Sequence, residues 1–240
     1  MKTRLDRLLV DRGLVESREK AQALIMAGEV LLNGQKASKP GQPVNFDAAL
    51  AVLARPPYVS RGGLKLAAAL KHFAIDVAGK VCVDIGSSTG GFTDALLQAG
   101  AARVHAVDVG AGQLAWSLRT DSRVRLHEGI NARELRADEI GEPVGLLTCD
   151  VSFISVTLIL PAVAPLLQPR GQMVILIKPQ FEVGKGQVGK GGIVRDPQLH
   201  RAACDRVTGA VREFGFETGI MDSPILGAEG NKEFLLYGHH

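Results

Sequence analysis

Cysteines and aromatic residues are scarce in this sequence of 240 residues. Its three cysteines, Cys82, Cys149 and Cys204, are odd in number and far apart. That pattern fits small buried side chains better than disulfides or a thiolate metal site. The six histidines show no ligand spacing either. We therefore expect neither a disulfide framework nor a bound metal.

Long hydrophobic runs are also missing. Stretches such as residues 158–167 are interrupted by prolines and are shorter than the roughly 20 residues that cross a bilayer. The first residues, MKTRLDRLLVDRG, carry charges in every turn, so the apolar core of a secretory signal is absent. A content of 46% hydrophobic and 22% charged residues is typical of a folded protein. We expect a cytoplasmic protein without a membrane segment.

Positive charge is concentrated near the start of the chain. Residues 1–55 contain nine Lys/Arg against six Asp/Glu, which accounts for the whole net charge of +3. A basic module beside a neutral one suggests a polyanionic partner, although ordinary surface charge explains so small an excess equally well.

Two helical patterns precede a hairpin pattern in this basic segment. Apolar residues recur at helical spacing in residues 5–9 and again in residues 21–25. Ser17 is a suitable N-cap for the second helix, and Gly28 is suited to end it. Residues 30–34, VLLNG, then read as a strand that enters an Asn-Gly turn. The pattern predicts a compact module of two helices and a hairpin.

The pattern RLD-LL-RGL-SR--A--LI-AG-V-LNG-----P resembles the S4 RNA-binding domain. This resemblance covers about fifty residues and implies structured RNA as the partner, recognised mainly through its backbone and shape. We place an α+β S4-like domain at residues 1–54 and a proline-containing linker at residues 55–59. The alternative is that the charges only solvate helix faces. The candidate phosphate contacts are Arg4, Arg7, Arg18, Lys20 and Lys36.

From residue 80 onward, short apolar runs alternate with helical stretches. Strands that alternate with helices indicate parallel βαβ units. We therefore expect residues 60–240 to form an α/β domain with a doubly wound, Rossmann-like sheet.

A glycine-rich turn follows the first strand of this domain, in VDIGSSTGGFTDALL. Gly86, Gly90 and Gly91 permit a tight turn and a close backbone approach, and the helix that follows offers free N–H groups. Asp108 ends the next strand about twenty residues later, where a carboxylate accepts from both hydroxyls of a ribose. The two features predict an adenosine-containing ligand, against the alternative that the glycines serve packing alone.

The spacing D-x-G-x-x-x-G-G resembles the first motif of class I S-adenosylmethionine-dependent methyltransferases. The resemblance implies S-adenosyl-L-methionine as the cofactor and places Asp108 at its ribose and Asn131 on its adenine side. It assigns the methionine end to Asp84, Gly86, Ser88, Gly90, Gly91 and Phe92.

A later apolar strand runs directly into a lysine, a proline and a basic glycine-rich loop, LIKPQFEVGKGQVGKGG. Asp150 and Lys178 each end a strand, so both side chains are expected at the ligand crevice of the sheet. Lys185 and Lys190 in the loop are candidates for contact with a substrate phosphate. The alternative is that Lys178 is a strand-end lysine paired with Asp150.

Four polar residues together resemble the Lys-Asp-Lys-Glu tetrad of FtsJ/RrmJ-like ribose 2′-O-methyltransferases: Lys65, Asp150, Lys178 and Glu233. The motifs SRGGLKL, DIGSSTGGFTD, VDVGAGQLAWSLR, DVSFIS, KPQFEVGKGQVGKGG and GNKEF follow an S4-like pattern in this order. In that arrangement the chain resembles the TlyA family, historically named hemolysin A, nearly end to end. Glu182 and Glu229 remain competitors of Glu233 for the fourth place.

The family resemblance implies 2′-O-methylation of a cytidine in ribosomal RNA, with Lys178 as the base that takes the hydroxyl proton. Lys65 and a low-dielectric pocket would depress the pKa of Lys178, whereas Asp150 and Glu233 would oppose that shift and fix its orientation. Large-subunit 23S rRNA is the favoured substrate, and 16S rRNA is the alternative. Two other functions stay open: a cytolysin, and a non-catalytic RNA-binding factor of ribosome assembly.

Overall fold

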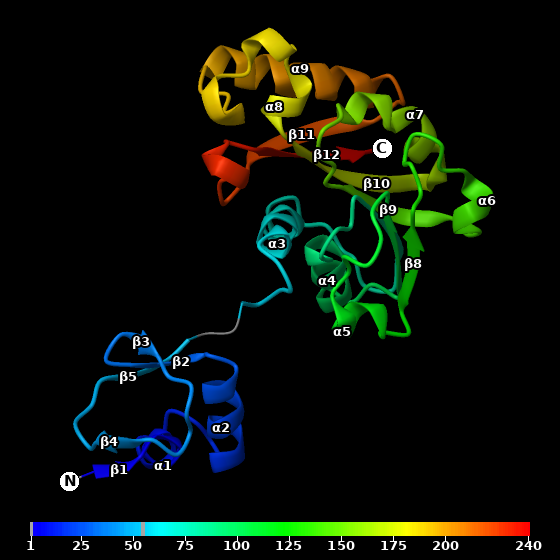
Figure 1. Ribbon diagram of the computed structural model, residues 1–240. Helices are drawn as coiled ribbons and strands as arrows, with labels where there is room; N and C mark the ends of the chain where they lie inside the picture. Colours follow the sequence, from blue (N-terminus) through cyan, green and yellow to red (C-terminus); the bar gives the residue numbers. More distant parts are fainter. Residues whose placement is uncertain (1, 54–55) are drawn as a thin grey trace. The chain divides into compact units, whose positions relative to one another are not determined.

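The computed structural model describes residues 2–53 and 56–240, and the chain forms two compact units (Figure 1). The first unit extends to Pro56 and the second comprises Pro57–His240. Part of the predicted linker, residues 54 and 55, lies outside the described residues. No described helix is long and apolar enough to cross a membrane.

The first unit packs two helices against short antiparallel strands. Its core consists of the apolar residues with helical spacing, among them Leu5, Leu8 and Ile25, all 0% exposed. The strands form a pair, β1 with β4, and a three-stranded sheet in the order β3-β2-β5. The elements are β1 (Lys2–Arg4), α1 (Leu5–Asp11), α2 (Arg18–Met26), β2 (Val30–Leu32), β3 (Gln35–Lys36), β4 (Pro43–Asn45) and β5 (Leu50–Val52).

The predicted helix and turn signals of this unit are confirmed. The Ser17 hydroxyl accepts a hydrogen bond from the Lys20 amide at 3.2 Å and caps α2. Gly28, just beyond α2, has a φ of +69°, as expected for a residue that ends a helix. Asn33 and Gly34, with φ of +49° and +81°, form the tight turn between β2 and β3.

The second unit contains a seven-stranded sheet in the order β11-β12-β10-β9-β6-β7-β8. The strands from β10 to β8 in that order are parallel, as the alternating pattern predicts, but β12 is antiparallel to both of its neighbours. The segment between β11 and β12 contains one 3₁₀ turn and no α-helix, so no crossover forms. The strands are β6 (Val81–Ile85), β7 (Arg103–Asp108), β8 (Val124–Glu128), β9 (Val144–Cys149), β10 (Leu167–Ile177), β11 (Glu217–Asp222) and β12 (Phe234–His239).

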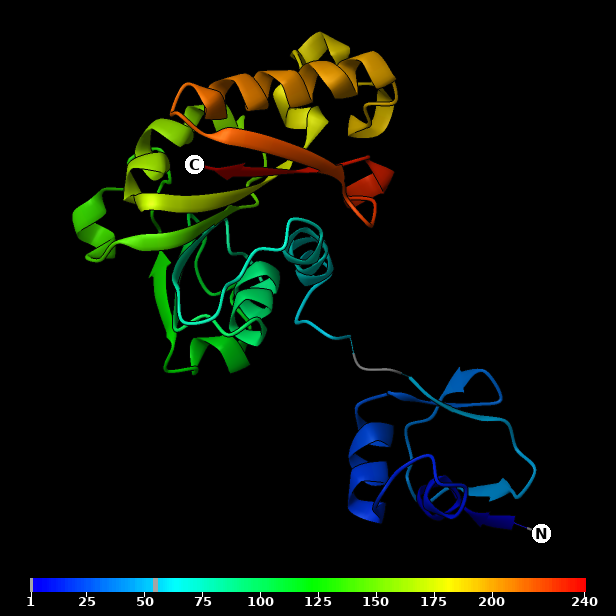
Figure 2. The ribbon, with the colours of Figure 1, turned by 180° about the vertical axis from the view of Figure 1, so that it is seen from behind.

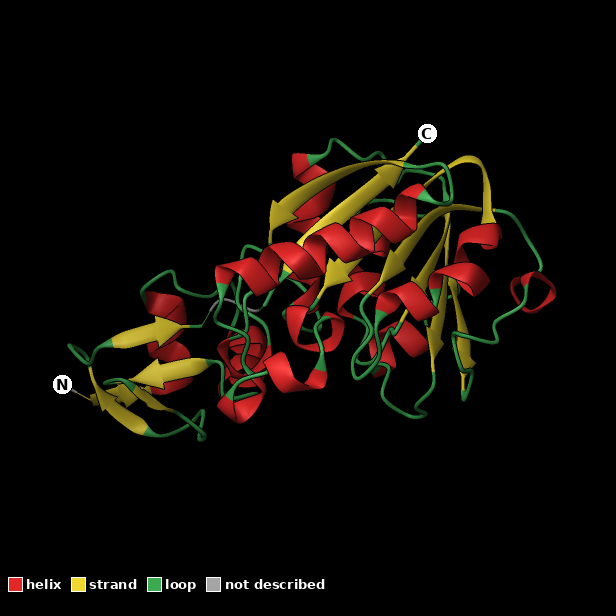
Figure 3. Cartoon of the chain, turned by 90° about the horizontal axis from the view of Figure 1, so that it is seen from above, coloured by secondary structure: helices red, strands yellow, loops and turns green. Residues whose placement is uncertain are grey.

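Helices cover both faces of this sheet (Figures 2 and 3). Neighbouring residues of one strand point to opposite faces, so Cys82 belongs to the core beneath α3 and α4, whereas Val83 belongs to the core beneath α7 and α9. The helices are α3 (Gly62–His72), α4 (Gly91–Gln98), α5 (Trp116–Arg119), α6 (Ala137–Ile140), α7 (Leu160–Val163), α8 (Pro179–Glu182) and α9 (Pro197–Arg212). Short 3₁₀ turns lie at Val156–Leu158, Ala164–Leu166, Lys185–Gln187, Lys190–Gly192 and Ala228–Gly230.

The chain order reverses beside the central strand β6. From β6 the chain continues to β7 and β8 on one side, and later returns to place β9 and β10 on the other. In open α/β sheets the ligand crevice lies at the carboxyl ends of the strands at such a reversal. Residues that directly follow β6, β9 and β10 therefore lie at the expected site.

Candidate active site

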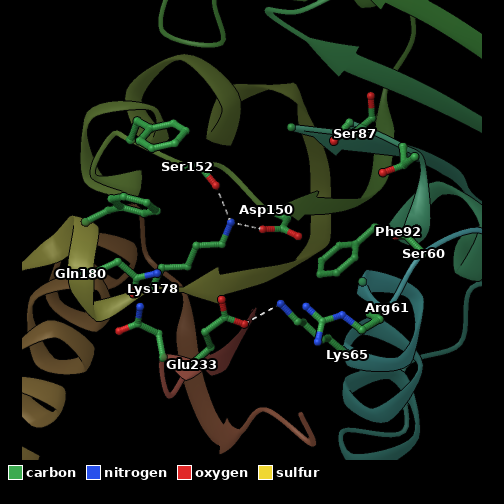
Figure 4. Close-up of a pocket in the computed structure, with 18 of the residues that line it drawn as sticks. Ser60, Arg61, Lys65, Ser87, Phe92, Asp150, Ser152, Lys178, Gln180 and Glu233 are labelled. Atoms are coloured by element: carbon green, nitrogen blue, oxygen red, sulfur yellow. Dashed lines mark hydrogen bonds and ion pairs between the residues drawn. The ribbon is translucent and has the colours of Figure 1, made fainter. Parts of the chain in front are cut away.

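A cavity of about 590 Å³ opens at these strand ends (Figure 4). The four residues of the predicted tetrad, Lys65, Asp150, Lys178 and Glu233, all line it. They come from four distant parts of the chain: the first turn of α3, the ends of β9 and β10, and the residue before β12. The fold therefore brings the predicted tetrad together.

The tetrad is arranged as two ion pairs. Lys178 Nζ lies 2.6 Å from Asp150 Oδ1 and also donates to the Ser152 hydroxyl at 2.8 Å. Lys65 Nζ donates to Glu233 Oε2 at 2.5 Å. We expected Glu233 to orient Lys178, but its carboxylate binds Lys65 instead, because α3 brings Lys65 to the start of β12. The pairing of Lys178 with Asp150, which also fits a merely structural lysine, is present.

Burial makes the Lys65–Glu233 pair the more enclosed of the two. The Lys65 side chain is 10% exposed and the Glu233 side chain is 2% exposed. A Cβ atom at Gly227 would collide with the Glu233 carboxylate, so a glycine there lets the chain pass close to the pair. Two charges this far from water are stable only together.

Backbone geometry fixes the other pair. Lys178 has an extended conformation, and Pro179 then occupies the first position of α8, where its fixed φ suits a helix start. The strand therefore ends at Lys178, and its side chain reaches the cavity. Glu182, at the end of α8, is 4% exposed and accepts from Ser155 Oγ at 2.6 Å and from the Val156 amide at 2.8 Å. These two hydrogen bonds hold the loop after Asp150. Desolvation raises the pKa of Glu182.

The two competitors for the fourth position differ from Glu233. Glu182 does not line the cavity. Glu229 does line it, but the structure gives it no ion pair with either lysine of the tetrad, and its backbone is left-handed with φ of +56°. Among the described glutamates, Glu233 is the one that pairs with a lysine of the tetrad.

An adjoining cavity of about 440 Å³ shares Gly86 and Ser88 with the first and is lined by Asp108 and Asn131. Each Asp108 oxygen accepts one backbone hydrogen bond, from Ser88 and from Gly110, both at 2.7 Å. These bonds fix the carboxylate at the end of β7, and its remaining lone pairs are available to a ribose. The acidic acceptor therefore lies where the sequence predicts it.

The glycines of the turn after β6 have different roles. A Cβ at Gly86 would lie 2.6 Å from the Asp150 carbonyl oxygen, so this glycine permits the close approach of two strand ends. A Cβ at Gly91 would collide with Ser60, where the first turns of α3 and α4 meet. Gly90 has a φ of +98° and lies against Leu118, outside the lining of both cavities. In this structure Gly90 serves packing, and its contact with the cofactor stays a prediction.

The contact of Asp84 with the cofactor also stays a prediction. Asp84 is 0% exposed, and its carboxylate accepts from Thr93 Oγ1 at 2.7 Å and from Thr148 Oγ1 at 2.9 Å. Desolvation raises its pKa to about 6 against the effect of these two bonds. Asp84 lines neither cavity, because alternation along β6 turns its side chain to the sheet face beneath α4. It supports the turn from beneath.

The residues present fit S-adenosyl-L-methionine. Ser88 and Phe92 line the first cavity beside the N-terminus of α4, and Asp108 offers an acceptor in the second. The buried Ser87 Oγ has no hydrogen-bond partner among the described residues, nor has Gln180 Oε1, and both residues line the first cavity. Buried polar atoms nearly always have partners, so a ligand is expected to supply them.

Most predicted RNA-binding cations of the first unit are paired with carboxylates. Asp6 is 0% exposed and accepts from Arg4 and Arg18 at 2.8 and 3.2 Å. The hydrogen bond from Arg4 is the largest cause that holds the Asp6 pKa well below its usual range. Lys20 pairs with Glu16 at 2.9 Å, and Arg7 lies 3.8 Å from Asp11. All four side chains are at least half exposed, so pairing offsets part of their charge without burying them, and their contact with RNA stays a prediction.

Two other predicted RNA-binding lysines have no carboxylate partner in the part of the chain that the structure describes. Lys36 and Lys190 are exposed and have no carboxylate partner among the described residues. The Lys185 side chain lies outside what the structure describes. Contact of these residues with RNA stays a prediction.

Sequence reasoning missed several cavity residues. Ser152 binds Lys178 and follows Asp150 by two positions, and Gln180 follows Lys178 by two. Asn231, 3% exposed, precedes Glu233 by two. Their proximity to the strand ends was the available signal.

Phe153 is 91% exposed, and its ring centroid lies 5.3 Å from that of Phe181 at the same cavity.

The three cysteines are free and buried, as predicted from their positions. Desolvation raises the pKa of Cys82 to about 12 and that of Cys204 to about 11. Within the described residues, no group of three His, Cys, Asp or Glu side chains is arranged to hold a metal.

A parallel-rich sheet with one inserted antiparallel strand, a glycine turn and an acidic residue after the next strand define a class I methyltransferase. Residues 58–240 match the family model of FtsJ-like methyltransferases, and residues 3–50 match that of the S4 domain. The chain belongs to the TlyA family of FtsJ-like methyltransferases.

Relatives and solved structures agree with this assignment. The chain is 48% identical to the 16S/23S rRNA (cytidine-2′-O)-methyltransferase TlyA of Mycobacterium tuberculosis, over 98% of the chain and 89% of the relative. It is 38% identical to the 23S rRNA (cytidine-2′-O)-methyltransferase TlyA of Campylobacter jejuni, over 95% and 96%. A solved structure from Streptococcus thermophilus, named as a candidate hemolysin, has a TM-score of 0.75 at 45% identity, covering 99% of the chain and 88% of that structure.

Proposed function

We propose that this protein transfers the methyl group of S-adenosyl-L-methionine to the 2′-oxygen of a cytidine ribose in ribosomal RNA. The observation that carries this proposal is the Lys178–Asp150 pair in a cavity that adjoins the cavity of Asp108. In this proposal Lys178 is the base, and it lies beside the expected position of the methyl donor. The relatives named above act on ribosomal cytidines, and the S4 domain supplies an RNA-binding module.

The residues fit the chemical requirements of this reaction. S-adenosyl-L-methionine, when bound, supplies a methyl group already activated by positive charge. The chain must therefore align one ribose hydroxyl and accept its proton. Lys178 in its neutral form takes that proton at Nζ, and the Asp150 carboxylate 2.6 Å away stabilises the ammonium that results. Ser152 holds Nζ from a second direction.

The remaining residues position these groups. The Lys65–Glu233 pair forms another wall of the cavity, where Lys65 orients the substrate ribose. Asp108 holds the ribose of the methyl donor, and Asn131 lies on the adenine side of the adjoining cavity. This proposal includes two domains, an S4-like domain at residues 1–54 and a methyltransferase domain at residues 60–240. It also includes a cytoplasmic location.

Large-subunit 23S rRNA is the proposed substrate, and 16S rRNA is the alternative, since the relatives include both kinds. Purified protein incubated with radiolabelled S-adenosyl-L-methionine and isolated ribosomal subunits tests the reaction and the choice together. We expect labelled ribose methyl groups on cytidines of the large subunit. Label on the small subunit alone contradicts the choice of 23S rRNA.

The same preparation tests the competing functions. Absence of label on either subunit and on free rRNA, with donor binding intact, contradicts the methyltransferase proposal and favours a binding factor. Lysis of red cells by the purified protein favours a cytolysin, particularly if a Lys178→Ala variant lyses them equally well.

A further inference from the structure

The glycine-rich basic loop, residues 184–195, is tied to the rest of the domain by two side chains among the described residues: His200 of α9, whose Nε2 lies 2.8 Å from the Val194 carbonyl oxygen, and Asn231, which lines the cavity. Asn231 Oδ1 accepts a hydrogen bond from the Val194 amide at 3.1 Å, and Asn231 Nδ2 donates to the Gly192 carbonyl at 3.0 Å. Asn231 is 3% exposed, and Val194 is 2% exposed. The backbone carbonyl of Asn231 accepts a hydrogen bond from the Gly227 amide at 2.8 Å. One buried amide therefore joins two chain segments that are far apart in the sequence.

Each of these segments carries a charged group of the proposed reaction. The 184–195 loop carries Lys190, which is exposed and lacks a carboxylate partner among the described residues. The 227–233 segment ends at Glu233, which pairs with Lys65. Gly192, Asn231 and Glu233 all line the 590 Å³ cavity. The loop is thus part of the wall of the active site, and Asn231 joins it to the segment that carries Glu233.

A glycine-rich loop needs such a clamp. Gly189, Gly191 and Gly192 lose more backbone freedom on ordering than other residues do. Within the loop, backbone hydrogen bonds join Gly189 to Ile193 and Gly192 to Gly189, at 3.1 Å each. The two bonds to Asn231 add a connection to the buried part of the domain. A loop ordered in advance binds a ligand without the entropy cost of ordering at that moment.

We propose that Asn231 is a positioning residue for RNA: it holds the 184–195 loop so that Lys190 meets a phosphate of the ribosomal RNA beside the cavity. This inference rests on the proposed function. The Lys178–Asp150 pair lies on other elements and does not depend on Asn231. Loss of Asn231 therefore affects binding of rRNA more than the chemical step.

Steady-state kinetics of Asn231→Ala on ribosomal subunits test the inference. We expect KM for the subunits to rise roughly tenfold, as two buried hydrogen bonds are lost, with kcat within about twofold and binding of S-adenosyl-L-methionine unchanged. Asn231→Asp keeps the acceptor for the Val194 amide and loses the donor to Gly192. Its KM should therefore lie between the KM of the parent protein and that of Asn231→Ala. Gln198→Ala, an exposed amide in the first turn of α9, is the matched control and should behave as the parent protein.

Two further measurements separate this role from general destabilisation. Amide exchange in residues 189–195 should accelerate in Asn231→Ala, while exchange in β6 and β9 stays unchanged. Lys190→Ala should raise KM in the parent protein and have little further effect in the Asn231→Ala background. Additive effects of the two substitutions, no effect of Lys190→Ala, or a fall in kcat alone would overturn the inference. If the parent protein methylates no rRNA, the proposed function itself has failed.

Discussion

Lys178 Nζ and Asp150 Oδ1 lie 2.6 Å apart although the two residues are 28 positions apart in the sequence, because β9 and β10 are parallel neighbours that end at the same edge of the sheet. Lys178→Ala removes the proposed base and leaves the Asp108 cavity intact. We expect methyl transfer to rRNA to fall by about 10²- to 10⁴-fold, the range of general base catalysis. Donor binding, measured by calorimetry, should be unchanged.

The matched control for this change is Lys71→Ala, an exposed lysine of α3 outside the cavity. Its transfer rate should equal that of the parent protein. Undiminished methylation by Lys178→Ala would remove Lys178 from the mechanism.

Asp108 provides a second prediction, on the affinity for the methyl donor. Its carboxylate is fixed by the Ser88 and Gly110 amides and faces the adjoining cavity. Asp108→Ala should weaken binding of S-adenosyl-L-methionine by about 1 to 3 kcal/mol, because hydrogen bonds to a charged acceptor are lost. Titration calorimetry measures this directly. Asp138→Ala, an exposed carboxylate on α6, is the control, and equal affinities of both variants would place the ribose elsewhere.

The positions of Asp150 and Lys178 could be predicted from the sequence because the ends of buried strands can be recognised in it, whereas Lys65 and Glu233 were assigned through the family resemblance. An apolar run followed at once by Asp150 or Lys178 marks the end of a buried strand, and parallel strands bring such ends together. The same reasoning placed Asp108 at the end of β7. The Ser17 cap and the Asn33-Gly34 turn could also be predicted, because each depends on the chemistry of a few neighbouring residues.

Pairing between distant side chains could not be predicted in this way. Which lysine binds Glu233 depends on how α3 packs beside β12, and no local pattern encodes that. The same limit applies to Asp6, which is buried and pairs with both Arg4 and Arg18, although these two side chains stay about half exposed. Asp84 was assigned by motif position, while alternation along β6 decides that it is buried on the sheet face beneath α4.

The buried Lys65–Glu233 pair predicts a strong effect on stability. Lys65→Met leaves the Glu233 carboxylate, 2% exposed, without its partner. Breaking such a pair costs about 3 to 5 kcal/mol of the free energy of unfolding. Adding Glu233→Gln removes the uncompensated charge and should recover part of the loss. Urea denaturation of both single variants and the double variant measures the coupling, and additive losses would show that the two side chains do not interact.

The first unit provides a prediction on RNA affinity. Lys36 is exposed without a carboxylate partner among the described residues, whereas Lys20 is paired with Glu16. A free lysine neutralises a phosphate more effectively than a paired one, because pairing with a carboxylate already offsets part of its charge. Lys36→Ala should therefore weaken rRNA binding and reduce its salt dependence more than Lys20→Ala does. Filter binding at several salt concentrations decides; a larger effect of Lys20→Ala would contradict the proposed surface.

Asp84 predicts how stability depends on pH. Desolvation raises its pKa to about 6, above the value of about 3.9 in an unfolded chain. The folded state therefore binds the proton more readily, and the free energy of unfolding falls as pH rises from about 4 to 6. A difference of two pKa units corresponds to about 3 kcal/mol.

Asp84→Asn keeps the site neutral. The free energy of unfolding of this variant, relative to that of the parent protein, should therefore rise by about 3 kcal/mol from pH 4 to 6 and then stay level. Urea denaturation from pH 4 to 7 measures the difference, with Asp138→Asn as the exposed control. A difference for Asp84→Asn that does not change with pH would mean that the Asp84 carboxylate stays charged in the folded protein throughout, stabilised by Thr93 and Thr148.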